Sequence, residues 1–100
     1  MLKWRYDLSE HDSQNKISWD ESTEQHFQKI LLEIPDLIRG IAELRVSKKA
    51  ESIIREEGRN VIVEKDMVDA FFAETPGGFI PAMKKSMEEL NIDYTKYGHL

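Results

Sequence analysis

The stretch that decides the fold runs from Ile34 to Ala70 and reads IPDLIRGIAELRVSKKAESIIREEGRNVIVEKDMVDA. Proline is well tolerated in the first turn of a helix, and glycine is the usual residue just past its end. Apolar residues recur at helical spacing between Pro35 and Gly58, and a β-branched run then leads into a second apolar helical pattern. This order predicts a long helix over about residues 35–57 and a later helix over residues 64–74.

Two apolar stripes lie within the predicted long helix. The first consists of Leu37, Ile38, Ile41 and Leu44, and the second consists of Val46, Ala50, Ile53 and Ile54. Continued by one turn, the first stripe reaches Lys48, so the two stripes are out of phase. Either the helix breaks near residues 46–47, with Ser47 as a new N-cap, or one continuous helix presents different faces to different neighbours. We favour the continuous helix.

The segment before Pro35 predicts another helix. Residues 18–21 and residues 22–25 both have the form of a capping box, so either Ser18 or Ser22 can begin it. Apolar residues at helical spacing follow, and the helix ends before Pro35 because the residue preceding a proline is disfavoured in the α region. Trp19 lies just before this helix or in its first turn, where it can fold back on Phe27.

The segment after Gly58 predicts a short extended piece and two further helices. Residues 60–63 are β-branched but too few to form a sheet alone. Residues 75–78, Thr-Pro-Gly-Gly, separate the helix over 64–74 from a helix that Pro81 opens and Asn91 ends. Methionines on these stripes are expected to fill the core. The aromatic tail over residues 92–100 is expected to dock on the body.

These patterns predict an all-α fold, a small bundle of about four helices with a short extended segment near residues 60–63. Residues 1–17 are polar and aperiodic, so we expect an irregular N-terminal arm followed by one helical domain over residues 18–100. One hundred residues suit one domain.

Composition excludes several classes of protein. The chain has no cysteine, which removes disulfides, thiolate nucleophiles and cysteine-ligated clusters within it. The absence of cysteine also fits a reducing cytoplasm, where we expect the chain to be located. The longest apolar runs are a few residues, so the sequence predicts no membrane span. A net charge of −5 argues against general affinity for nucleic acid, which depends on clustered basic residues.

No candidate catalytic or metal-binding set emerges. His11 lies between Glu10 and Asp12 in the polar arm, and His26 lies on the first helix beside Phe27. A metal site needs several converging ligands held rigidly, and neither histidine has them in sequence. The serines lack the context of a nucleophile elbow, and residues 77–78 are a turn. The sequence therefore predicts no catalytic residue, no metal and no cofactor, and no catalytic activity by the chain itself.

The charge is unevenly distributed along the chain. Residues 39–59 contain six basic and four acidic residues, a charge of +2, so the remaining residues sum to −7. We predict that this segment binds a partner, which is another protein or a second copy of the chain. The residues expected to contact it are Arg39, Arg45, Lys49 and Arg55. Nucleic acid is the rival partner, and the net charge disfavours it.

Part of this pattern resembles a known domain. The order of several features is similar to that in the C-terminal domain of the B subunit of light-independent protochlorophyllide reductase. These features are Trp19, the turn at Ile34-Pro35, Arg39, a charged helix ending at Gly58 and residues 61–70. Free-standing small bacterial proteins carry the same domain. The resemblance covers residues 19–70 and implies a helical fold and an accessory or interaction role, because the domain is an appendage of the reductase.

Two shorter resemblances point elsewhere. Residues 74–97 are similar to a family of small uncharacterised bacterial proteins that have an Ala-Thr-Pro stretch and an Ile-Asp-Tyr tail. Residues 45–50 and 57–70 look like pieces of a histone fold. The alternative functions are therefore a histone-fold-like nucleic-acid-binding protein, or an accessory component of a pigment or cluster reductase.

Overall fold

The structure is a computed structural model, and it describes residues 16–100. The predicted arm over residues 1–17 lies almost wholly outside the described residues, as does His11. The elements in chain order are β1 (Ser18–Trp19), α2 (Glu21–Leu32), α3 (Asp36–Glu56), β2 (Val61–Ile62), α4 (Glu64–Glu74), the 3₁₀ turn η1 (Gly77–Phe79), α5 (Ile80–Glu89) and the 3₁₀ turn η2 (Tyr94–Tyr97). Four α-helices thus dominate residues 16–100, which confirms the predicted all-α bundle.

Helix α2 begins directly after Asp20. The Asp20 carboxylate accepts hydrogen bonds from the hydroxyl of Thr23 at 2.9 Å and from its backbone N–H at 3.1 Å, and these bonds lower the pKa of Asp20. The predicted caps at Ser18 and Ser22 are wrong. Ser18 belongs to β1, and Ser22 lies in the first turn, where its hydroxyl donates to Asp20.

A small parallel sheet joins β1, which precedes α2, to β2, which follows α3. Ser18 pairs with Val61 and Trp19 with Ile62, and the backbone N–H of Asp20 donates to the Ile62 carbonyl at 2.9 Å. The extended segment near residues 60–63 is confirmed, but its strand partner was not anticipated. Trp19 stacks on Phe27 with ring centroids 4.6 Å apart, as expected from their placement.

Helix α3 is continuous from Asp36 to Glu56, which confirms the single long helix. The alternative break with Ser47 as an N-cap is wrong, because the Ser47 hydroxyl donates to the Glu43 carbonyl inside the helix at 2.7 Å. Past its end, Gly58 has a φ of 72°, a left-handed conformation that glycine adopts without strain.

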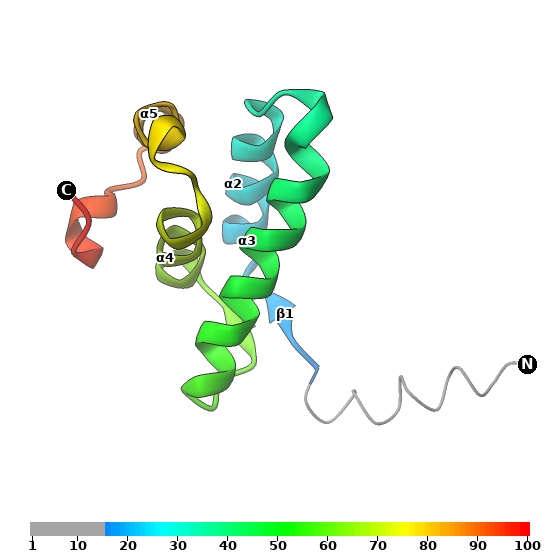
Figure 1. Cartoon of the computed structure of the whole chain (residues 1–100). Helices are drawn as coiled ribbons and strands as arrows, with labels where there is room; N and C mark the ends of the chain where they lie inside the picture. Colours follow the sequence, from blue (N-terminus) through cyan, green and yellow to red (C-terminus); the bar gives the residue numbers. More distant parts are fainter. Residues whose placement is uncertain (1–15) are drawn as a thin grey trace, which may run out of the picture.

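The core lies where α4 and α5 cross the pair formed by α2 and α3 (Figure 1). In the view of Figure 1 the axes of α2 and α3 run up the page, whereas α4 and α5 are seen nearly end-on. The buried side chains include Phe27, Leu31, Ile54, Ile62, Val68 and Phe71, together with Met67, Met83 and Met87. The methionines therefore fill the core as predicted.

Two polar contacts fix the elements that follow α3. The buried carboxylate of Asp66 accepts two hydrogen bonds from the Arg59 guanidinium and one from the Val63 backbone N–H at 2.9 Å. The first of these contacts raises the pKa of Arg59. Together they hold the loop before α4 against the first turn of that helix.

The C-terminal tail docks on α4 as expected. The Tyr97 hydroxyl donates to Glu64 at 2.6 Å. The pKa of Tyr97 is raised mainly by burial and, to a smaller extent, by this hydrogen bond. His99 Nε2 lies 2.7 Å from an Asp69 oxygen, and its ring stacks on Phe72 with centroids 4.0 Å apart. The tail therefore covers one side of α4 instead of extending into solvent.

Candidate functional site

The two apolar stripes of α3 have different environments. Val46, Ala50 and Ile54 of the second stripe are buried against α4 and the rest of the core. The first stripe is left largely uncovered: Leu37 is 93% exposed, Ile41 57% and Leu44 55%. The phase difference seen in the sequence therefore separates a stripe that packs in the core from a stripe that faces solvent. An exposed run of large apolar side chains on one helix is typical of an interaction surface.

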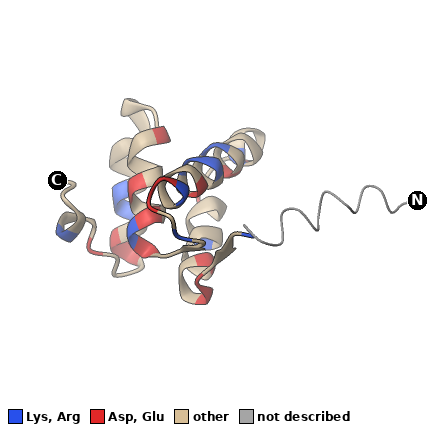
Figure 2. Cartoon of the chain, turned by 90° about the horizontal axis from the view of Figure 1, so that it is seen from below, with Lys and Arg blue, Asp and Glu red and all other residues tan. Residues whose placement is uncertain are grey.

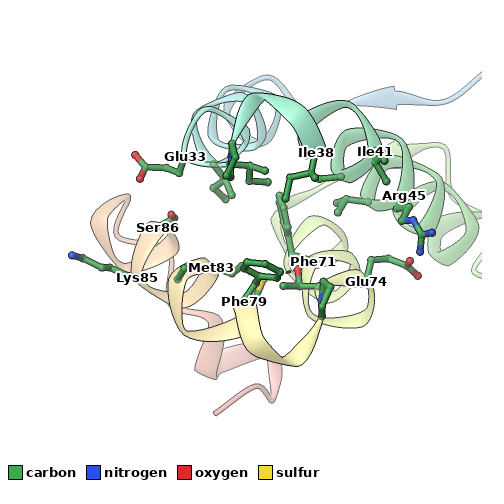
Figure 3. Close-up of a pocket in the computed structure, with 18 of the residues that line it drawn as sticks. Glu33, Ile38, Ile41, Arg45, Phe71, Glu74, Phe79, Met83, Lys85 and Ser86 are labelled. Atoms are coloured by element: carbon green, nitrogen blue, oxygen red, sulfur yellow. Dashed lines mark hydrogen bonds between the residues drawn. The ribbon is translucent and has the colours of Figure 1, made fainter.

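An apolar groove of about 600 Å³ lies beside this stripe. Ile38 and Ile41 of α3 form one wall, Phe79 and Met83 form the opposite wall, and Phe71 lies between them (Figure 3). Ile38 is 41% exposed and Phe79 is 55% exposed, so both walls present apolar surface to solvent. The groove and the exposed stripe share Ile38 and Ile41 and form one continuous apolar region.

The charged side chains of the groove stand at its two ends. Glu33 and Lys85 lie at one end with the hydroxyl of Ser86, and Arg45 and Glu74 lie at the other (Figure 3). The middle is apolar, apart from the Thr75 hydroxyl, which donates to the Met83 sulfur at 3.3 Å. No pair of carboxylates or histidine with an acid converges in this groove, so its lining suits contact better than proton transfer.

Arg39 has an internal role. Its Nε donates to the Leu31 carbonyl at 2.8 Å, which also accepts from the Ile34 backbone N–H at 2.9 Å. Its Nη2 donates to the Ile34 carbonyl at 2.8 Å, so the guanidinium binds the last turn of α2 and the chain just after it. Its guanidinium also pairs with Asp36 at 2.9 Å. Arg39 therefore holds the turn between α2 and α3.

The structure does not bring the four predicted partner-binding residues together on one face. Arg45 lines the groove and makes no ion pair within residues 16–100, whereas Arg55 is exposed and lies 3.9 Å from Glu51. Lys49 is half-buried on the same helix. Of the four, Arg45 alone lines the groove.

The basic residues of α3 include one small group, Arg45, Lys48 and Lys49, with Glu43 before it and Glu51 after it. Both signs of charge therefore occur along the helix (Figure 2). A phosphate-binding face usually has a larger set of basic groups without carboxylates beside it.

The groove itself could not be derived from the sequence, because Phe79, Met83 and Phe71 meet α3 only through the crossing of the helices. The phase difference between the stripes was the one available signal, and it pointed to α3. The two histidines of residues 16–100 lie on different elements: His26 is half-buried on α2, and His99 of the C-terminal tail contacts Asp69 of α4. Within residues 16–100 no three His, Asp or Glu side chains are grouped closely enough to hold a metal ion.

The chain matches the family described as "Protein of unknown function (DUF2621)" over residues 2–100, and it therefore belongs to that family. No curated protein and no solved structure matches it. None of these findings links the chain to the protochlorophyllide reductase B subunit. Among the helices of residues 16–100, none has the length and apolar content needed to span a bilayer.

Proposed function

We propose that this chain is a non-catalytic protein-interaction module that binds a protein partner through the exposed stripe of α3 and the groove beside it. The observation that carries the proposal is the continuous apolar region from Leu37 and Leu44 through Ile41 to Phe79. A contiguous set of exposed large apolar side chains usually marks a surface that another molecule covers. Covering a fully exposed Leu or Ile side chain contributes about 1.5–3 kcal/mol, and covering these side chains would offset part of the cost of association.

The accessory role implied by the protochlorophyllide reductase resemblance supports the same proposal. That domain is an appendage, and a groove lined by side chains from α2 through α5 gives such an appendage a surface for another chain. The proposal includes a single helical domain over residues 18–100 and a cytoplasmic location. Arg45 sets the orientation of the partner, since charges at the margin of an interface act mainly on orientation and encounter rate.

Nucleic-acid binding through the basic residues of α3 is the rival function. Its support is the segment charge of +2 and the similarity of residues 45–50 and 57–70 to parts of a histone fold. The carboxylates that flank the basic group of α3, Glu43 and Glu51, oppose it, as does the net charge of −5 (Figure 2).

The two functions are separated by affinity capture from the native host at low and at moderate salt. Three baits are compared: the native chain, Ile41→Asp in the groove, and Leu100→Asp as a matched control, because Leu100 is an exposed apolar residue that does not line the groove. A protein retained by the native chain and by Leu100→Asp but lost with Ile41→Asp supports the module. Equal retention by all three baits contradicts it. Recovery of nucleic acid alone, lost steeply as salt rises, favours the rival.

A further inference from the structure

The groove lacks the feature that a small-molecule site is expected to have. Such sites combine an apolar cavity with a few polar groups that converge on one point and fix the ligand. Here Glu33 and Arg45 stand at opposite ends, and the span between them is formed by Ile38 and Ile41 on one side and Phe79 on the other (Figure 3). This arrangement favours an elongated occupant that is apolar in its middle and charged at both ends.

A second copy of the chain has these properties. In a two-fold symmetric dimer the same patch meets itself, so the patch must be self-complementary. Glu33 and Arg45 flank Ile38 and Ile41 in sequence, and both charged residues line the groove. If the two copies of α3 run antiparallel, Arg45 of each copy lies at the Glu33 end of the other. A parallel arrangement would instead bring like charges together.

The other charges at the groove ends are compatible with this arrangement. Glu74 stands at the Arg45 end and Lys85 at the Glu33 end (Figure 3). Glu89 also lines the groove, and it borders a smaller hollow together with Glu33 and Ser86, so the Glu33 end has two acids and one base. That end therefore attracts Arg45 of an approaching copy. The attraction between Glu33 and Arg45 then selects the antiparallel orientation.

We infer that the groove is an interface between two copies of this chain, in which Ile38 and Ile41 of each antiparallel α3 enter the groove of the other. This inference rests on the proposed interaction surface and names its occupant. Ile38 is 41% exposed, Ile41 57% and Phe79 55%, so this contact removes apolar surface of both copies from water. Removal of apolar surface from water drives the association.

The test is sedimentation equilibrium of the full chain from about 10 μM to 1 mM, with circular dichroism to establish that each variant is folded. The native chain is expected to dimerise as concentration rises, and Ile41→Asp is expected to be monomeric throughout. Arg45→Glu and Glu33→Arg each replace two attractive contacts per dimer by repulsive ones and are expected to weaken association about tenfold. The double variant Glu33→Arg with Arg45→Glu is expected to regain the native dissociation constant.

Glu33 and Arg45 form no ion pair with each other within one copy. If the double variant regains the native dissociation constant, the two residues must therefore pair between copies. A native chain that stays monomeric up to 1 mM overturns the inference, as does a double variant that associates no better than the single variants. The proposed function fails by a different result, equal retention of host proteins by the native and Ile41→Asp baits. The two failures are therefore distinguishable.

Discussion

Replacing Arg39 by methionine tests whether this residue stabilises the fold, as its hydrogen bonds to the end of α2 indicate, or serves only to bind a partner. The variant Arg39→Met keeps an unbranched apolar chain but loses the hydrogen bonds to the carbonyls of Leu31 and Ile34, both 2.8 Å long, and a weaker one to Leu32 at 3.3 Å. A hydrogen bond from a charged donor contributes about 1.5–3 kcal/mol. The Arg39 side chain is 32% exposed, so water partly replaces these bonds, and we expect a total loss of about 2 kcal/mol.

The assay is thermal and urea unfolding followed by circular dichroism. A loss of about 2 kcal/mol lowers the Tm of a domain this size by roughly 8–16 °C. Arg45→Met is the matched control, because it makes the same chemical change on the same helix and Arg45 has no hydrogen bond to α2. This variant should change the free energy of unfolding by no more than about 0.5 kcal/mol. Equal destabilisation by the two variants would refute the role assigned to Arg39 in the α2–α3 turn.

Three further variants test other parts of the fold. Asp66→Asn removes the buried charge that pairs with Arg59 and should lower the free energy of unfolding by about 2 kcal/mol in urea titrations; an unchanged midpoint would contradict this role. Gly40→Ala should raise that free energy by about 0.8–1 kcal/mol, because a Cβ at this helical position meets open space, whereas Gly58→Ala should lower it by about 1 kcal/mol because its φ is 72°; the same sign for both would refute the explanation. The raised pKa of Tyr97 means that its neutral form is favoured in the folded chain, so its stabilising contribution is present below the ordinary value of 10.0 and is lost as pH rises above it. Unfolding measured from pH 8 to 11 should therefore show an alkaline decrease that Tyr97→Phe reduces, and identical pH profiles would exclude this linkage.

Local signals predicted the helices well. Pro35 and Gly58 bound the long helix, and the spacing of apolar residues gave α4 and α5, because each signal depends on neighbours within one or two turns. The strand β1 was missed because its partner lies across the whole of α2 and α3, and no local pattern at Ser18–Trp19 specifies a parallel pairing. For the same reason Asp20, which follows that strand, was overlooked as the N-cap of α2.

The candidate site was predictable only in part. The phase difference between the α3 stripes indicated that they face different directions, and the structure shows that Leu37, Ile41 and Leu44 face solvent. Charge alone selected Arg39 and Arg45 together, but charge does not distinguish a guanidinium that caps a neighbouring helix from one that lines a groove. The groove also needs Phe79 and Met83, which reach α3 only through tertiary packing.

The most direct test of the interaction surface is photo-cross-linking in the native host with a photoreactive residue at position 41. The same residue at position 100 is the control, since Leu100 is 89% exposed and does not line the groove. A protein-interaction surface at Ile41 predicts a discrete adduct from position 41 that is absent from position 100, and an adduct of twice the chain mass would identify a second copy as the partner. No adduct from position 41, or the same adducts from both positions, would contradict the proposed surface.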